Sequence, residues 1–160
     1  MSIRRRRRQH RPIPARNRRK EGLACFGDFG SPSPNSEDRH AEKKLISQAD
    51  RARDARDWVS AARYYREALD HKPDNLAIWV QYGHALKESR NVAEAENAYR
   101  KSLELDAGVA DTHLQLGHAL KIQGRRIEAG TAYLRALALD PALDHASIEL
   151  RALGWLAPQG

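Results

Sequence analysis

Polar side chains recur in this sequence at the spacing of one face of a helix. An amide, an imidazole and an ammonium group follow one another three residues apart, and the same trio returns further along the chain: Gln81, His84 and Lys87, then Gln115, His118 and Lys121. Residues three apart share a helix face, so these groups could hydrogen-bond an extended or helical peptide, with the lysines favouring acidic side chains. The second trio follows the first by 34 residues, and Asp50 and Arg53 stand 34 residues before His84 and Lys87. The pattern predicts a polar protein-binding face of these eight residues.

Two other interpretations of the same residues stay open. Duplication of a repeat copies surface residues whether or not they bind anything, so a recent duplication would also leave two identical trios. The imidazoles of His84 and His118 could share a metal ion, but zinc takes four ligands and no cysteine or third histidine is placed nearby. We therefore expect no metal at this face.

The residue patterns that carry catalysis are missing from the sequence. No nucleophile stands at a fixed spacing from a base, no glycine-rich loop could cradle a phosphate, and no pair of carboxylates marks an enclosed pocket. The aromatic residues Trp58, Trp79 and Tyr64 follow helical spacing and are expected to pack rather than to stack on a cofactor. We expect a non-catalytic protein without a cofactor.

The elements that hold the polar face come from a repeat with a period of about 34 residues. Residues 76–109 and 110–143 are identical at 13 of 34 positions, far more than accidental self-similarity gives. Residues 42–75 form a third and more divergent copy. Each copy is rich in good helix formers and is interrupted at regular intervals by helix-stopping residues. We expect two helices in each copy, and one further amphipathic helix over residues 142–153, ended by Gly154.

Small residues inside these helices predict close packing. Glycine in a helix costs about 1 kcal/mol relative to alanine, so Gly83 requires a packing reason. We expect Gly83 to face Ala95 across the hairpin, while Tyr99 fills the space between successive hairpins. Asn91, followed by Glu94 three residues later, predicts a helix N-cap with its reciprocal acidic partner.

The residues at these positions resemble the tetratricopeptide repeat, whose pattern is a large residue, Leu-Gly, a large residue, Ala, an aromatic residue, Ala and Pro. The second copy supplies Trp79, Tyr82, Gly83, Leu86, Ala95, Tyr99 and Ser102. The third supplies His113, Leu116, Gly117, Leu120, Ala129, Tyr133, Ala136 and Pro141, with a histidine where the family has a bulky apolar residue. The first keeps Ala61, Tyr65, Ala68 and Pro73.

The resemblance implies an all-α fold with three helical hairpins in a superhelix. The hairpins are expected over about residues 42–75, 76–109 and 110–143, within a repeat region of 37–143. A capping helix and the C-terminus would take residues 144–160. A disordered arginine-rich tail over residues 1–36 would precede the repeats. The first helices of the hairpins would line a concave surface that carries the polar face.

The resemblance also implies a function, a protein–protein interaction module or scaffold that binds a peptide or partner domain on its concave surface. Some family members clamp the terminal carboxylate of chaperone tails with a lysine and an asparagine. The matching places here hold Ile46 and Asp50, which disfavours that ligand. The hairpins are also similar to the repeat block that precedes the catalytic domain of some bacterial glycosyltransferases. The alternative is therefore a detached or truncated recognition module of such an enzyme.

Charge is concentrated in the tail. The chain has a net charge of +7, and residues 4–20 contain ten Lys and Arg. Such a run could bind nucleic acid or another anionic surface through phosphate contacts, weakly and without sequence preference, because it has no interleaved aromatic residues to stack on bases. A solvated tail without a partner is the other possibility.

The remaining features limit the location and the assembly of the protein. The single cysteine, Cys25, cannot form an intramolecular disulfide. No apolar run is long enough to span a membrane or to act as a signal peptide, so we expect a cytoplasmic protein. The apolar residues around Trp155 could support a homo-oligomer.

Overall fold

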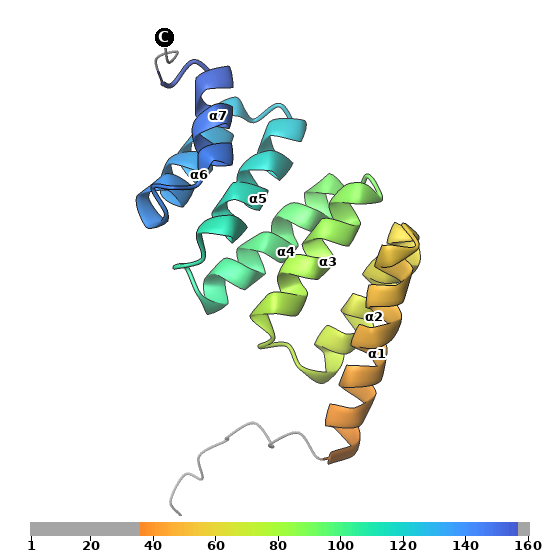
Figure 1. Cartoon of the computed structure of the whole chain (residues 1–160). Helices are drawn as coiled ribbons and strands as arrows, with labels where there is room; N and C mark the ends of the chain where they lie inside the picture. Colours follow the sequence, from red (N-terminus) through yellow and green to blue (C-terminus); the bar gives the residue numbers. More distant parts are fainter. Residues whose placement is uncertain (1–35, 157–160) are drawn as a thin grey trace, which may run out of the picture. The chain divides into compact units, whose positions relative to one another are not determined.

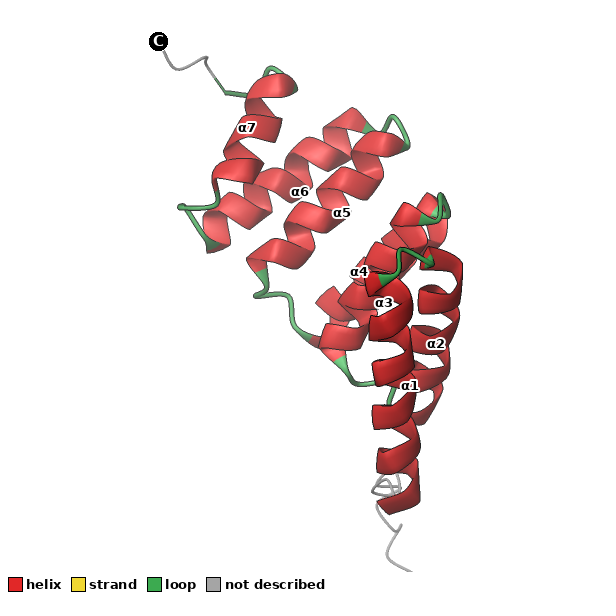
Figure 2. Cartoon of the chain, turned by 45° about the vertical axis from the view of Figure 1, so that its right-hand side comes forward, coloured by secondary structure: helices red, strands yellow, loops and turns green. Residues whose placement is uncertain are grey.

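Every regular element of the described chain is an α-helix. The computed structural model describes residues 36–156, which contain seven helices: α1 (Ser36–Asp54), α2 (Trp58–His71), α3 (Leu76–Glu88), α4 (Val92–Leu105), α5 (Ala110–Ile122), α6 (Arg126–Leu139) and α7 (Asp144–Ala152). Helices α1/α2, α3/α4 and α5/α6 pack as hairpins, and α2 contacts α3, α4 contacts α5 and α6 contacts α7 (Figure 1). Short turns join the helices, and no strand occurs between residues 36 and 156 (Figure 2). The predicted all-α fold of three hairpins and a closing helix is confirmed.

Several sequence predictions fall on other parts of the chain. The tail expected over residues 1–36 reaches the described residues only at Ser36, where α1 begins. The cationic run of residues 4–20 and Cys25 lie outside the described residues. Between residues 36 and 156, no helix is both long enough and apolar enough to cross a membrane.

Each hairpin contains one fully buried tyrosine in its second helix. Tyr65, Tyr99 and Tyr133 are all 0% exposed. A β-carbon added at Gly83 would stand 2.6 Å from Cε1 of Tyr99, and one added at Gly117 would meet the ring of Tyr133. We expected Tyr99 to fill the space between successive hairpins, and this contact gives it a place within its own hairpin as well. Tyr99 packs within its own hairpin, because its ring takes the space that the missing side chain of Gly83 leaves.

The first helix of each hairpin, and α7, ends in the same turn. The second residue after the helix has a positive φ, and the next amide N–H donates to a carbonyl five residues back, which is a Schellman motif. The left-handed residues are Arg56 (φ 59°), Arg90 (φ 71°), Gly124 (φ 77°) and Gly154 (φ 79°). Glycine takes this conformation without steric cost, whereas an L residue with a β-carbon loses roughly 1–2 kcal/mol. Two of the four turns therefore hold a strained arginine.

The helix starts depart from the sequence prediction at one place. Asn75 accepts a hydrogen bond from the backbone N–H of Ile78 at 3.4 Å and so caps α3. Asn91 does not cap α4 with its side-chain oxygen, which corrects our expectation. Its amide instead donates to Glu94, whose carboxylate also accepts a hydrogen bond of 2.7 Å from the Tyr82 hydroxyl. The Glu94 carboxylate thus holds the Asn91 side chain away from the capping position.

Candidate functional site

Successive first helices are linked by a side-chain bond that repeats in register. The donor is a cation and the acceptor a side-chain oxygen, and both recur once in every repeat: Arg53 to Gln81 at 3.4 Å, Lys87 to Gln115 at 3.2 Å and Lys121 to Glu149 at 2.6 Å. The bonds connect α1 to α3, α3 to α5 and α5 to α7. These four helices therefore place their polar side chains on one continuous face, from Asp50 on α1 to Glu149 on α7, which we call the inner face.

The predicted binding residues come together along this face, and several of them bond to one another. Asp50 accepts hydrogen bonds from the Tyr65 hydroxyl at 2.7 Å and from Arg53 at 2.9 Å. The Lys87 side chain is only 16% exposed and also lies 3.9 Å from the carboxylate of Glu88. The predicted residues thus have a packing role between repeats, which is a third interpretation beside binding and duplication.

Each buried tyrosine meets a residue of the inner face, but the three contacts differ. The hydroxyl of Tyr133 lies 3.2 Å from Nδ1 of His118. In the second hairpin, the rings of His84 and Tyr99 stand edge to face with centroids 5.8 Å apart. The Tyr99 hydroxyl is buried and has no hydrogen-bond partner among the described residues. The second hairpin therefore contains a buried polar group that its neighbours leave unsatisfied.

Burial controls the charge of the two histidines. Burial lowers the pKa of His84 below its ordinary value of 6.5, and the charge of Lys87 lowers it further against opposing effects of Asp111 and Glu88. Burial likewise lowers the pKa of His118, in spite of the Glu149 carboxylate 3.7 Å away. Both imidazoles are therefore neutral at pH 7, so they act as hydrogen-bonding groups rather than cations.

Two equivalent hollows open on the inner face at the ends of its helices. The first has a volume of about 580 Å³ and is lined by Arg53, Arg56, Trp58, Gln81, His84 and Glu88. The second, of about 710 Å³, includes the equivalent of every one of these residues in the next repeat: Lys87, Arg90, Val92, Gln115, His118 and Ile122. His84, Glu88 and Lys121 complete its lining. Each hollow thus combines three parts: a lysine or arginine from the first helix of one hairpin, the left-handed arginine that follows that helix, and polar side chains from the first helix of the next hairpin.

The left-handed arginines are the free cations of these hollows. Arg56 and Arg90 are both exposed, and neither guanidinium forms a hydrogen bond or ion pair with the residues described. Arg53, by contrast, bonds Asp50, Asp54 and Gln81. An incoming anion would therefore reach Arg56 and Arg90 without displacing an intramolecular partner.

Sequence reasoning missed Arg56, Arg90 and Glu149. A signal for the last was present, because Glu149 stands one repeat after Gln115, in the helix that continues the pattern. Arg90 and Arg56 stand one and two repeats before Gly124, which marks the left-handed position. The repeat register alone could have identified Glu149, whereas the two arginines become notable only once the φ of their turns is known.

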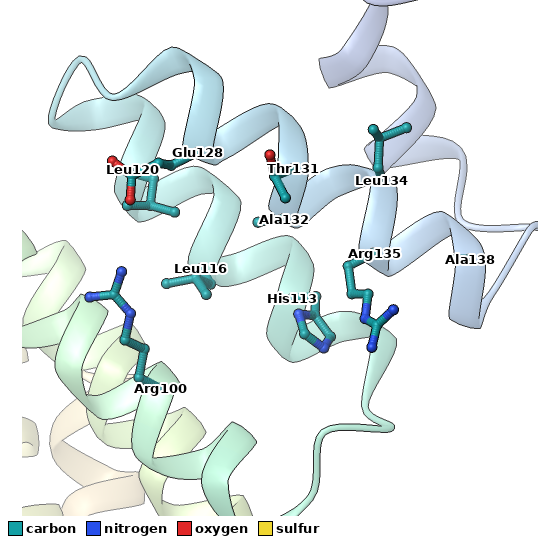
Figure 3. Close-up of a pocket in the computed structure, with 10 residues that line it drawn as sticks. All are labelled: Arg100, His113, Leu116, Leu120, Glu128, Thr131, Ala132, Leu134, Arg135 and Ala138. Atoms are coloured by element: carbon teal, nitrogen blue, oxygen red, sulfur yellow. The ribbon is translucent and has the colours of Figure 1, made fainter.

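The outer side of the third hairpin contains a different hollow, of about 620 Å³, between α4, α5 and α6. Its apolar lining comes from Leu116, Leu120, Ala132, Leu134 and Ala138, with Arg100, His113, Glu128, Thr131 and Arg135 around them. Figure 3 shows Arg100 reaching from α4 toward Leu116, and Arg135 beside His113. None of these residues belongs to the inner face.

Metal binding finds no support in this geometry. Within residues 36–156, no three histidine, cysteine or carboxylate side chains come together in a group that could hold a metal ion. The two imidazoles of the inner face are instead occupied with the tyrosine rings beneath them.

Two adjoining parts of the chain match models of one protein family. Residues 52–109 and residues 110–143 each match a model described as a tetratricopeptide repeat. Together the matches run without a gap from residue 52 to residue 143, which is more than half of the 160 residues. No curated protein matches the chain significantly.

Solved structures with similar folds come from several kinds of protein. The Arabidopsis OM64 TPR domain is 22% identical with a TM-score of 0.70, over 73% of this chain and 97% of that one. The first TPR of Spaghetti (RPAP3), bound to an HSP90 peptide, is 21% identical with a TM-score of 0.68, over 72% of this chain and 91% of that one. The Thermobaculum terrenum O-GlcNAc transferase is 28% identical with a TM-score of 0.65, over 74% of this chain but only 23% of the transferase.

Proposed function

We propose that this chain, which belongs to the tetratricopeptide-repeat family, is a non-catalytic protein-interaction module that binds an acidic segment of a partner protein along its inner face. The coarse role of a protein-interaction module follows from the family. The face and the acidic chemistry of the ligand are our proposal.

The paired hollow with its left-handed arginine is the observation that carries the proposal. Backbone strain persists only where something else compensates for it, and it concentrates at functional sites. Arg56 and Arg90 hold strained positions where Gly124 and Gly154 fit without cost. Neither arginine gains an intramolecular partner in return, so a ligand is the compensation we infer.

The composition of the hollows supports an acidic ligand. The first contains two cations, Arg53 and Arg56. The second contains three, Lys87, Arg90 and Lys121. The neutral histidines His84 and His118 can hydrogen-bond a peptide backbone without adding charge. The one carboxylate common to both hollows, Glu88, disfavours a ligand with uniform negative charge. We therefore expect carboxylates on the partner at two separated points, one for each hollow.

Replacing both left-handed arginines by glycine tests this proposal without weakening the fold. The Arg56→Gly/Arg90→Gly variant should be more stable than the parent chain, because it relieves a strain of roughly 1 kcal/mol or more at each site. Binding to an array of glutamate-containing peptides should weaken at least about tenfold, the equivalent of about 1.4 kcal/mol. Fluorescence polarisation with the tightest peptide of the array measures the affinity, and thermal unfolding measures the stability.

A matched control removes the same charge elsewhere. Arg51 on α1 and Lys101 on α4 are exposed and lie outside both hollows, so Arg51→Gln/Lys101→Gln should keep the parent affinity. Equal weakening by this variant would mean that only net charge matters. Unchanged affinity of the Arg56→Gly/Arg90→Gly variant would reject the inner-face hollows as the binding site.

A second candidate function is a recognition module of a glycosyltransferase. The similarity to the Thermobaculum terrenum O-GlcNAc transferase favours it, since 28% identity extends over 74% of this chain. The matched region is 23% of that enzyme, so the likeness extends to no transferase activity here. Sequencing the transcript downstream of this coding region tests the idea, and a transcript without a transferase domain would argue against it.

Nucleic-acid binding by the arginine-rich tail stays a prediction of the sequence, because residues 4–20 lie outside the described residues. The prediction is salt-sensitive retention on heparin. A variant that lacks residues 1–36 and is retained as strongly as the full chain would contradict it.

A further inference from the structure

The outer hollow of Figure 3 exists because two aromatic residues of the repeat are replaced. Trp79 and Tyr82 occupy this place in the second hairpin, and their rings pack edge to face with centroids 6.1 Å apart. The equivalent residues of the third hairpin are His113 and Leu116, and both line the hollow. Two smaller side chains therefore leave an open volume where the preceding hairpin is filled.

The replacements remove volume but keep the local support. The indole N–H of Trp79 donates to the carbonyl of Pro73 at 2.8 Å. Nε2 of His113 lies 3.0 Å from the carbonyl of Ala107, the equivalent of Pro73 in the next repeat. Since a carbonyl only accepts, His113 Nε2 carries the proton in this bond. The histidine thus anchors the turn between hairpins as the tryptophan does, without filling the groove.

The hollow is elongated along α6. Its lining includes Glu128 near one end of that helix and Ala138 near the other, a span of about 15 Å at a rise of 1.5 Å per residue. This length equals about three turns of a helix laid against it. The apolar part of the lining includes Leu116, Leu120 and Ala132, with Leu120 beside Glu128 at one end (Figure 3). The shape suits two apolar side chains one turn apart rather than a single compact group.

The polar groups around the hollow leave one charge available. Arg100 pairs with Glu96, and Glu128 accepts hydrogen bonds from Arg125. Thr131 donates to the carbonyl of Ile127. Arg135 is exposed and forms no hydrogen bond or ion pair within the described part of the chain. A complementary ligand therefore has an apolar stripe and an adjacent negative charge.

We propose that this groove is a second protein-binding site, which takes an acidic amphipathic helix of a partner with its apolar stripe on Leu116, Leu120 and Ala132 and a carboxylate on Arg135. Apolar anchors supply most of the affinity in such helix-in-groove contacts, and the ion pair fixes the register. The site is independent of the inner face, because the two share no lining residue.

The test fills the groove with the residues of the preceding hairpin. In His113→Trp/Leu116→Tyr, the new indole can donate to the Ala107 carbonyl as Trp79 does to Pro73, and the new hydroxyl can reach Glu128 as Tyr82 reaches Glu94. The probe is a side-chain-bridged helical peptide with two leucines one turn apart and glutamates beside them. We expect its affinity to fall at least about tenfold, or about 1.4 kcal/mol, measured by titration calorimetry. The control Arg51→Gln/Lys101→Gln, whose residues line neither this groove nor the inner-face hollows, should bind it like the parent.

Further variants keep the test decisive if the filled protein folds poorly. Arg135→Glu changes only an exposed residue and should weaken the binding of the peptide severalfold. A peptide whose glutamates are replaced by lysines should regain the affinity for this variant. Parent-like binding of the peptide by either variant would overturn the proposal. Two other results would also overturn it. Binding of octanoate without binding of the peptide would indicate that the ligand is a free amphiphile. A dimer on size exclusion that the filled variant loses would indicate that the groove binds a second copy of this chain.

Discussion

The second hairpin, α3/α4, and the third, α5/α6, belong to repeats that are identical at 13 of 34 positions and differ mainly where they meet solvent or another hairpin. The shared residues include the glycine and tyrosine of each core, Gly83 with Tyr99 and Gly117 with Tyr133. These contacts are steric and leave little choice of residue.

The differences change what each hairpin offers to a partner. A strained arginine, Arg90, ends α3, whereas Gly124 ends α5. Trp79 fills the outer groove of the second hairpin, and His113 leaves that of the third open. One backbone plan thus presents a cationic inner hollow in one repeat and an apolar outer hollow in the next. In this chain, the repeat fixes the core and the exceptions to it supply the surfaces.

A larger residue at Gly83 should destabilise the protein about as much as a larger residue at Gly117. Gly83→Val and Gly117→Val would each press a branched side chain into a buried tyrosine ring, at a cost of about 3 kcal/mol in the free energy of unfolding. Urea unfolding followed by circular dichroism measures it. Gly108→Ala is the control, because a β-carbon there meets only the Asp106 side chain, at 3.1 Å. A large loss at one glycine and none at the other would break the equivalence of the two cores.

A buried carboxylate distinguishes the second hairpin from the third. Glu96 is 4% exposed and binds Gln123 and Arg125 of the following turn, whereas Gly130, at the equivalent place, makes room for Trp155. Burial alone would raise the pKa of Glu96, but the bonds from Gln123 and Arg125 outweigh it and lower the pKa.

Removing this carboxylate should loosen the contact between the two hairpins. Glu96→Ala deletes several charge-assisted bonds while its arginine partners turn to solvent, so we expect a loss of about 2 kcal/mol. Thermal unfolding measures it. Ala62 holds the same position in the first hairpin, so alanine fits there sterically. A variant as stable as the parent would mean that the network contributes nothing.

The two buried tyrosine hydroxyls should respond oppositely to removal. Tyr133→Phe breaks the contact with His118 and should cost about 1 kcal/mol, whereas Tyr99→Phe removes a buried hydroxyl without a partner and should be neutral or stabilising. Paired denaturant titrations compare the two variants with the parent. Equal losses would indicate that the Tyr99 hydroxyl does have a partner in solution.

Acidification should weaken the fold slightly through the inner-face histidines. The folded protein lowers the pKa of His84 and His118 below 6.5, so near pH 6 it binds fewer protons than the unfolded chain. Their contribution is complete above pH 6.5 and is lost as the pH falls from there through the lowered values. His84→Gln/His118→Gln should flatten the stability profile between about pH 7 and about pH 5.5. An unchanged slope would assign the acid sensitivity to other groups.

The sequence predicts the hairpins well, because the packing positions are tied to the repeat period. Gly83 and Gly117 indicate a close approach, since each stands in an otherwise strong helix. The tyrosine that fills that approach was harder to place, because Tyr99 could face its own hairpin or the next one. The choice depends on the ring direction, which spacing does not specify.

The candidate site is harder to predict from the sequence. Gln81, His84 and Lys87 stand out because they repeat, although Lys87 and Gln115 bond each other across the inner helices. Arg56 and Arg90 do not stand out, because an arginine in a polar turn looks ordinary until its φ is known. His113 is visible as a departure from the repeat, but the hollow that it opens depends on the volume of its neighbours.

The affinity of an acidic peptide for the Arg56→Gly/Arg90→Gly variant shows whether the inner-face hollows bind an acidic segment. We expect a protein that unfolds at a higher temperature than the parent and binds the peptide at least about tenfold more weakly. A stabilised protein that binds the peptide as tightly as the parent would contradict it.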